Sequence, residues 1–563
     1  LRAAPHIAPI CDNNCNLYYD DKMRANLLNN YFGSVFVKDN GNSSVFHSRS
    51  NSSTYPNNII FSPERICSVI NKLKSNAAAG PDGLPACFFK HLRHSLSVPL
   101  SIIFSLSYDT GSLPDDWLHA IVCPIFKKGN ASKCENYRPI SLTRISCKIM
   151  ETIINENILD YLLSSNLITR HQHGFLRHHS TTSQLLECMY DWGNILESKG
   201  SCHVVYIDFK KAFDSVSHSK LMLKLKAYGF PLKILAWLKS FLSCRTQNVR
   251  INSTYSDCIN VLSGVPQGSV LGPTLFLLFI NDIVDICVDC TVKIYADDVK
   301  VYKLIRTIHD TIILQKCLNK IFEWAHTWQL DMSVQKCACL VIGKSDFNFV
   351  KYSLGAHYIN FVTDIRDLGV LIDSNLKFHI HCSQLYKKAC SRAGLILRTF
   401  YSRNVDVFIK AYIIYVRPIL EYNSVIWSPY YKMDIDLLEK VQRNFISRVC
   451  SMCNVGKYLN YEERLKLFNL EPLHVRRIVC DITEMYKTVK GYANSNLINA
   501  IPYAHFESTR GHRFKFAHTF NDNRVKKHFI FNRIVNMWNS LPDNVFNTDI
   551  VKSFRNRISA CMF

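Results

Sequence analysis

Apolar residues follow two periodicities along this chain and divide it into a mixed middle and a helical end. In the middle, residues 204–209 and 291–302 have the length and β-prone composition of strands, and the second run is folded into a hairpin. Residues 271–283 and 312–328 have the length and spacing of helices. From about residue 376 onward almost every apolar segment has helical spacing. The pattern predicts an α+β fold that ends in a largely helical region.

The first part of the chain is less regular. Residues 1–38 predict a small helical lead-in, and residues 39–58 are rich in Asn and Ser, which is typical of a linker. A helix is expected from Ser62-Pro63, because Pro is well tolerated at the first helical position. A strand at 121–126 and a helix at 146–163 follow.

Length and charge narrow the class of protein. The chain has 563 residues, more than one core usually holds, and 48% of them are hydrophobic, so several packed domains are expected. Lys and Arg outnumber Asp and Glu by 67 to 45, a net charge of +22. A folded chain with this excess favours a polyanionic partner, most simply nucleic acid, although a merely basic surface is the alternative.

The cysteines and the apolar runs indicate where in the cell the protein resides. The 22 cysteines are scattered through apolar segments and no secretion signal opens the chain, so we expect reduced thiols in an intracellular protein, in nucleus or cytoplasm. No apolar run reaches the length of a membrane span, so no membrane partner is expected. The first residue is Leu, and a further domain upstream is compatible with the sequence.

Two adjacent acids stand at the predicted hairpin turn, Ala296-Asp297-Asp298. Taken alone, such a pair is more typical of a solvated turn, where Asp is an ordinary residue. A third acid, Asp208, stands at the C-terminal end of the predicted strand 204–209. An acid in this position is costly to bury unless it is paired or bound to metal. If the strand lies beside the hairpin in a β-α-β-β sheet, the three carboxylates converge.

Three converging carboxylates suit phosphoryl transfer with two metal ions. Two Mg²⁺ ions about 4 Å apart activate a 3′-hydroxyl and stabilise the leaving pyrophosphate. Mg²⁺ prefers hard oxygen ligands and keeps positions open for phosphates. The sequence therefore predicts two Mg²⁺ ions, with Mn²⁺ as a substitute.

Motifs in a fixed order carry a resemblance to a known family. The chain resembles the reverse transcriptases of non-LTR (LINE-type) retrotransposons, most similar in style to the Jockey and CR1 groups, over about residues 20–560. The motifs, in chain order, are Gly80-Pro81-Asp82-Gly83, Ile125-Phe126-Lys127-Lys128-Gly129 with Asn136-Tyr137-Arg138-Pro139, His173-Gly174-Phe175-Leu176-Arg177 with Ser180-Thr181-Thr182, Asp208-Phe209-Lys210-Lys211-Ala212-Phe213-Asp214, Gly264-Val265-Pro266-Gln267-Gly268-Ser269, Tyr295-Ala296-Asp297-Asp298, residues 330–336, and Asp367-Leu368-Gly369-Val370.

The resemblance implies a right-hand polymerase fold. The implied divisions are an N-terminal lead-in and linker (1–59), fingers (60–200), a palm that holds the catalytic core (201–375), a helical thumb (376–450) and a basic C-terminal region of unassigned role (451–563).

The resemblance also implies roles for single residues. Asp208 and Asp297 would bridge both metal ions, Asp298 would hold the outer one, and the Phe209 carbonyl would add a ligand. Phe213 falls at the steric gate that selects deoxynucleotides, although a plain core position is the alternative. The nucleotide site would be completed by Arg138, Lys127, Lys128, Gln267 and Gly268, and Lys336 stands where a general acid for pyrophosphate is proposed. Asp214 is expected to be structural or solvated.

The implied enzyme is an RNA-directed DNA polymerase, a nucleotidyltransferase. It would take an RNA template, deoxynucleoside triphosphates and a DNA primer or nicked target DNA; the family usually carries an endonuclease upstream. Two alternatives stay open: an RNA-dependent RNA polymerase with the same palm, and a catalytically decayed copy that serves only as an RNA-binding scaffold. The sequence leaves the oligomeric state undetermined.

Overall fold

The computed structural model of the chain describes residues 7–41, 46, 48–49, 55, 58–198, 200–347, 349–504, 512–518 and 524–562. Much of the linker expected at 39–58 lies outside the described residues.

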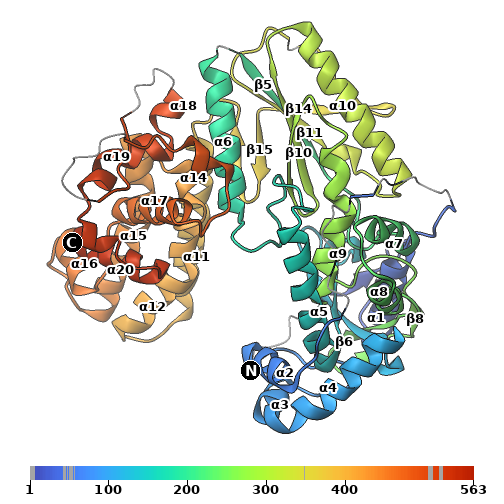
Figure 1. Cartoon of the computed structure of the whole chain (residues 1–563). Helices are drawn as coiled ribbons and strands as arrows, with labels where there is room; N and C mark the ends of the chain where they lie inside the picture. The colour runs from blue at the N-terminus through green and yellow to red at the C-terminus, as the bar shows by residue number, and fades with distance from the viewer. Residues whose placement is uncertain are drawn as a thin grey trace.

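A five-stranded sheet forms the centre of the molecule (Figure 1). Its spatial order is β14-β11-β5-β10-β9, and β5 pairs antiparallel with both of its neighbours. The predicted hairpin is present as β9 and β10. The strands are β5 (Ser201–Ile207), β9 (Thr291–Tyr295), β10 (Asp298–Ile305), β11 (Ala338–Ile342) and β14 (Asn360–Val362).

Both faces of β5 are buried, which explains why its sequence is a continuous apolar run and does not alternate with polar residues. Val205 and Ile207 belong to the core shared with the N-terminal half of the chain. Cys202 and Val204 belong to a second core, shared with the C-terminal half. The central strand is thus fixed from two sides, and whatever follows Ile207 is held at a defined place.

A second sheet lies in the N-terminal half, with the order β4-β3-β6-β7 and β8 paired to β6. Leu28 and Phe32 of α1 pack on Val122 and Val249 of this sheet. The strands are β3 (His119–Phe126), β4 (Tyr137–Leu142), β6 (Thr246–Ile251), β7 (Thr254–Tyr255) and β8 (Ile259–Asn260). The helices of this half are α1 (Asp21–Ser34), α2 (Pro63–Lys72), α3 (Ala86–His91), α4 (Arg93–Thr110), α5 (Ile145–Ser164), α6 (Thr181–Glu197), α7 (His218–Ala227), α8 (Leu232–Leu242), α9 (Leu271–Ile280) and α10 (Ile308–Thr327).

Short two-stranded pairs complete the β structure: β1 (Ile10–Cys11) with β2 (Leu17–Tyr18), β12 (Ser353–Leu354) with β13 (His357–Tyr358), and β15 (Asp364–Asp367) with β16 (Val370–Asp373).

Helices dominate the C-terminal part, as predicted, and form a separate lobe, orange to red in Figure 1. One core runs from Leu185 of α6 through Phe445 of α15 to Trp538 of α19 and Phe554 of α20. The division expected after residue 450 falls inside α15, and residues on both sides of it share this core. The helices are α11 (His379–Thr399), α12 (Val405–Tyr415), α13 (Arg417–Glu421), α14 (Ser424–Trp427), α15 (Lys432–Cys453), α16 (Tyr461–Leu467), α17 (Leu473–Val489), α18 (Arg524–Lys527), α19 (Ile530–Ser540) and α20 (Val551–Met562).

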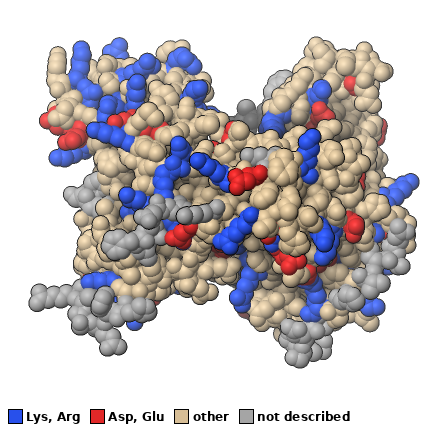
Figure 2. Space-filling model, turned by 90° about the horizontal axis from the view of Figure 1, so that it is seen from above, with Lys and Arg blue, Asp and Glu red and all other residues tan. Residues whose placement is uncertain are grey.

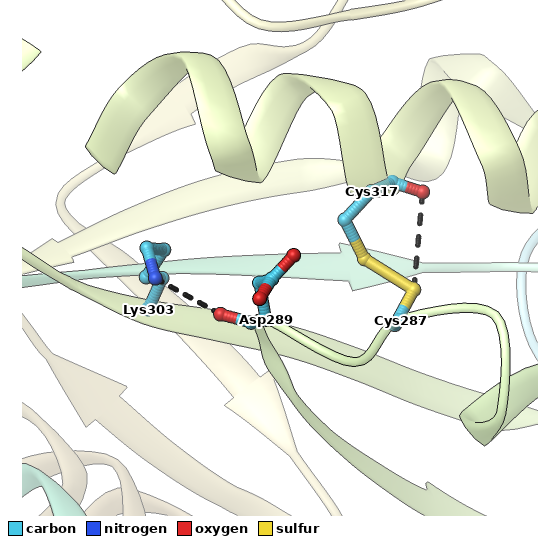
Figure 3. Close-up of a disulfide and its surroundings, with 4 residues drawn as sticks. All are labelled: Cys287, Asp289, Lys303 and Cys317. Carbon is cyan, nitrogen blue, oxygen red and sulfur yellow. Dashed lines mark hydrogen bonds between the residues drawn. A yellow bond between two sulfur atoms is a disulfide. The ribbon is translucent and has the colours of Figure 1, made fainter. Parts of the chain in front are cut away.

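One cysteine pair corrects the expectation that all the thiols are reduced. Cys287 and Cys317 form a disulfide that joins the loop before β9 to α10 (Figure 3). Beside it, the Lys303 ammonium donates a hydrogen bond to the Asp289 carbonyl at 2.9 Å. The sequence interval of 30 residues gave no sign of this pairing, because the two cysteines meet only through the packing of α10 on the sheet. No helix in the described part of the chain has the length and apolar character needed to cross a membrane.

A buried ion pair, Lys224 with Asp282, lies among the aromatic side chains of the N-terminal half. The Lys224 side chain is 0% exposed, and its ammonium donates to Asp282 at 2.5 Å and to the Phe279 carbonyl at 2.6 Å. It also lies 3.8 Å from the centre of the Trp328 ring. Burial lowers the pKa of Lys224 to about 8, although Asp282 opposes that shift.

This lowered pKa predicts stability that rises with pH. Between pH 8 and 10.5 the unfolded chain holds the Lys224 proton and the folded chain does not, so the free energy of unfolding increases by on the order of 3 kcal/mol across that window. Lys224→Met removes this component. Urea unfolding at pH 8, 9 and 10 should show the free energy of unfolding of the wild type increasing with pH relative to that of Lys224→Met. Lys226→Met, exposed on the same helix, is the control and should track the wild type; parallel curves for Lys224→Met and the wild type would contradict the prediction.

Candidate active site

Strand register brings the predicted acids together. In the β5–β10 ladder Ile207 pairs with Val299, so one step further along places Asp208 opposite Asp298. Directly opposed residues of an antiparallel pair have Cα atoms about 4.5–5.5 Å apart. Asp298 also pairs with Tyr295 of β9, which leaves Ala296 and Asp297 as the turn. Asp208, Asp297 and Asp298 therefore meet at one end of the central sheet.

Two of the three carboxylates, Asp297 and Asp298, have raised pKa values. Desolvation raises the pKa of Asp297, and the neighbouring Asp208 carboxylate raises it further. Asp298 is exposed by surface area, yet protein atoms crowd its carboxylate; this desolvation, followed by the charge of Asp297, raises its pKa to about 6. Three acids that destabilise one another's charge need cations nearby.

Positive side chains face these acids from two directions. Lys336 Nζ lies 3.3 Å from Asp208 Oδ2. Partial burial lowers the pKa of Lys127, and the nearby charges of Arg138 and Lys336 lower it further, which places these three cations in one group. Lys127 follows β3, and Arg138 lies on β4 opposite Ile125 of β3. Lys128 is exposed and adds a further positive charge beside Lys127.

Phe213 is held by other rings. It stacks on Phe276 of α9 with ring centres 4.3 Å apart, and the exposed Phe175 meets its edge at 6.1 Å. Phe213 itself is only half-buried. A ring fixed from behind and open on one side is a rigid wall, so its packing is compatible with both the gate and the core interpretation.

Gln267 and Gly268 form a tight contact with the N-terminal sheet. The Ser141 amide donates to the Gln267 carbonyl at 2.7 Å, and the Gln267 side-chain amide donates to Asp214 at 2.8 Å. Gly268 has φ +120°, and a Cβ added there would lie 2.5 Å from the Ser141 carbonyl oxygen. Asp214 thus orients Gln267, and burial raises the pKa of Asp214 to about 6.

The backbone after Asp208 is anchored to the segment that carries Lys336. Ser333 donates to the Asp208 carbonyl and Lys210 donates to the Asp331 carbonyl, each at 2.7 Å. These two hydrogen bonds form the antiparallel bridge between Phe209 and Met332, and the Phe209 carbonyl takes no part in it. The Phe209 side chain itself is buried in the core.

The donors at this end of the sheet fit a hard divalent cation. All three are carboxylates, and Asp208 Oδ2 is a buried atom without a hydrogen bond among the described residues, with Lys336 as its ion-pair partner. Within the same residues, no three His, Cys, Asp or Glu side chains lie close enough together to hold a metal ion as they stand. What indicates a cation at this place is therefore the chemistry of the three donors.

Sequence reasoning missed two supports of the hairpin. Gln172, buried between α5 and α6, accepts a hydrogen bond from the Ala296 amide at 3.0 Å. Lys300 of β10 forms a buried ion pair with Asp367 of β15. The partners are 124 and 67 residues apart in sequence, so no local pattern connects them. Two sequence signals were available: Gln172 stands beside the motif His173-Gly174-Phe175, and Asp367 belongs to the motif Asp367-Leu368-Gly369-Val370.

Comparison with known proteins agrees with this geometry. Residues 125–395 match the family described as reverse transcriptase (RNA-dependent DNA polymerase). The chain is 28% identical over 399 residues to the RNA-directed DNA polymerase from mobile element jockey of Drosophila melanogaster, which covers 69% of this chain and 43% of that protein. It is 28% identical over 407 residues to the probable RNA-directed DNA polymerase from transposon X-element of the same species, covering 70% and 44%. It is 27% identical over 396 residues to the probable RNA-directed DNA polymerase from transposon BS of Drosophila melanogaster, and this match covers 67% of this chain and 43% of that protein. The matched part spans less than half the length of these relatives.

The close approach at Gly268 generates a prediction. Gly268→Ala forces the loop away from Ser141 and strains the backbone, so we expect about 1–3 kcal/mol of destabilisation and a higher KM for nucleotide. Gly491→Ala is the control, because Gly491 also has positive φ but its Cβ would meet open space. Thermal unfolding and steady-state kinetics measure the two effects. A Gly268→Ala protein no less stable than Gly491→Ala would contradict the close contact.

Proposed function

We propose that the protein copies retrotransposon RNA into DNA from a primer 3′-hydroxyl, because residues 125–395 match the reverse transcriptase family and the chain is 28% identical to RNA-directed DNA polymerases of Drosophila mobile elements. The observation that supports this most directly is the meeting of Asp208, Asp297 and Asp298 at one sheet end, opposite Lys127, Arg138 and Lys336. Carboxylates for metal ions and cations for a triphosphate are the two halves of a nucleotidyl-transfer site.

We assign the parts of a right-hand polymerase as follows. The fingers are residues 60–200, the palm is 201–375, and the thumb is 376–450. The central sheet is then the palm sheet, and β3 and β4 carry Lys127 and Arg138 from the fingers to the palm acids. Residues 451–563 form the basic C-terminal region, packed in the same core as the thumb.

The carboxylates have divided tasks in this proposal. Asp208 and Asp297 repel each other and face Lys127 and Arg138, so they suit the bridging positions of two Mg²⁺ ions. Among the neighbouring charges, Asp297 affects the pKa of Asp298 most and Asp208 least, so we assign Asp298 to the outer ion. Bound Mg²⁺ would supply the Lewis acidity that activates the 3′-hydroxyl and stabilises pyrophosphate. Lys336, already paired with Asp208, would be positioned to give a proton to the leaving group.

The remaining residues bind the nucleotide and the template. Arg138 and Lys127, with Lys128, hold the triphosphate, and the Phe213 ring excludes a ribose 2′-hydroxyl. Gln267 and Gly268 lie under the base pair, where glycine permits close approach. Lys and Arg are more frequent than acidic side chains on the face seen in Figure 2, and a net charge of +22 suits a template–primer duplex held through its phosphates. Binding should therefore weaken steeply with salt.

Primer extension on poly(rA)/oligo(dT) with Mg²⁺ tests the proposal. The wild type should extend the primer, and Asp297→Asn should lower kcat by at least about 10²–10³-fold, because it removes one of the charges that hold the metal ions. Asp289→Asn, in the loop before β9 of the same hairpin, is the control and should keep wild-type activity. Template–primer affinity by filter binding should be unchanged in both.

Each other outcome of this assay has a defined meaning. Extension that survives Asp297→Asn would overturn the assignment of the site. No extension by well-folded wild type that still binds RNA would favour the decayed-scaffold alternative.

Sugar selection gives a separate prediction at Phe213. Phe213→Ala removes the ring that a ribose 2′-hydroxyl would meet, so kcat/KM for ribonucleotides should rise by at least about tenfold relative to deoxynucleotides, a change of about 1.4 kcal/mol. Phe213→Tyr keeps the bulk and should keep the selectivity. Single-nucleotide incorporation with dTTP and UTP measures the ratio. An unchanged ratio would favour the core interpretation of Phe213.

A further inference from the structure

The segment between α5 and α6 lies directly against the catalytic hairpin. Ile294 of β9 donates a backbone hydrogen bond to the His171 carbonyl, and the His173 amide donates to the Ile294 carbonyl, both at 2.9 Å. Gln172 and Ile294 form a parallel bridge. The segment thus adds a short extra rung to the outer edge of the palm sheet, next to the turn that bears Asp297.

The Gln172 side chain reaches past this rung to the turn itself. It is 1% exposed, and its Oε1 accepts from the Ala296 amide at 3.0 Å and from the Gly174 amide at 2.8 Å. Ala296 has φ +56°, a left-handed conformation that costs a residue with a Cβ about 1–2 kcal/mol. An unfavourable turn persists only when its surroundings hold it. One side-chain carbonyl here fixes the amide of that residue.

Gly174 shows how close the two backbones are. A Cβ added at Gly174 would lie 2.5 Å from the Ala296 amide nitrogen. The segment and the turn are in direct contact, so the position of one determines the position of the other.

The segment is itself anchored from behind by buried polar groups. His173 Nδ1 lies 3.0 Å from Ser183 Oγ, and its Nε2 lies 3.5 Å from Glu187 of α6. Glu187 forms an ion pair with Lys293 of β9 and accepts from Ser495 and Asn496, at 2.9 and 2.8 Å. These contacts do not involve the Gln172 side chain, so removing that side chain acts on the turn and leaves the anchor in place.

From these contacts we infer that Gln172 is a positioning residue for the catalytic turn. Its side-chain carbonyl holds Ala296 in the left-handed conformation and so fixes the direction in which the Asp297 and Asp298 carboxylates point. The consequence for catalysis rests on the proposed function. The hydrogen bond by which Gln172 fixes the Ala296 turn does not depend on that function. Gln172 reaches the reacting groups only through Ala296.

Hydrogen exchange on the full chain tests the hold directly. Gln172→Met keeps the volume of the buried side chain but removes the acceptor, so exchange in peptides covering residues 292–299 should speed up at least tenfold. Gln172→Glu restores an acceptor oxygen and should restore slow exchange. Gln184→Met is the matched control, because Gln184 is fully buried on α6 and neither of its amide atoms has a hydrogen bond.

Kinetics supply the second readout. In Gln172→Met, kcat should fall about 10- to 100-fold and the Mg²⁺ concentration for half-maximal rate should rise, while KM for template–primer stays within threefold. Unchanged exchange in peptides 292–299 would overturn the inference, as would equal loss in Gln184→Met. If the wild type shows no polymerase activity, the exchange measurement still decides whether Gln172 holds the turn, and only the proposed function fails.

Discussion

The interaction on which the site depends is the antiparallel pairing of β5 with β10. Both faces of β5 are buried, in two separate cores, so the strand cannot shift register without exposing apolar side chains or burying polar ones. Ile207 is thereby fixed opposite Val299, and the acids beyond this pair are placed side by side. Apolar burial along the strand holds together, at its end, charges that would otherwise separate.

That arrangement also explains where the cations come from. Three carboxylates meet at the sheet end. Lys336 lies 3.3 Å from Asp208, and the other cations of the group, Lys127 and Arg138, come from the second sheet. The two sheets meet where Ser141 donates to the Gln267 carbonyl and Gly268 allows the backbones to touch. Electrostatic balance at the site is therefore a property of how the two sheets dock.

Sequence alone predicted what depends on local pattern. The strand before Asp208, the hairpin and the helical C-terminal part all follow from short-range periodicity, and the acids follow from their place at strand ends. It could not predict the Cys287–Cys317 disulfide or the contact from Gln172 to Ala296, because each joins segments that only tertiary packing brings together. The start of β10 also differs: Asp298 is a strand residue paired with Tyr295, although the pattern assigned it to the turn. The assigned metal, nucleotide and gate roles remain predictions for the experiments.

The C-terminal region, which has no assigned role, is joined by buried charge to the hairpin that bears Asp297. The two carboxylate oxygens of Glu187 have different partners. Oε2 pairs with Lys293 of β9, and Oε1 accepts hydrogen bonds from Ser495 and Asn496. Burial raises the pKa of Glu187, but His173 and the Lys293 ammonium outweigh burial and hold that pKa well below its usual range. Without the hydrogen bonds from Ser495 and Asn496, Glu187 Oε1 would be buried with unsatisfied lone pairs. The ionised carboxylate would then be less stable, and its ion pair with Lys293 would be weaker. The C-terminal region therefore stabilises the ion pair that fixes β9, and β9 leads directly into the turn bearing Asp297. Ser495 and Asn496, more than 300 positions after Glu187 in the sequence, thus belong to the same buried network as the hairpin that bears Asp297.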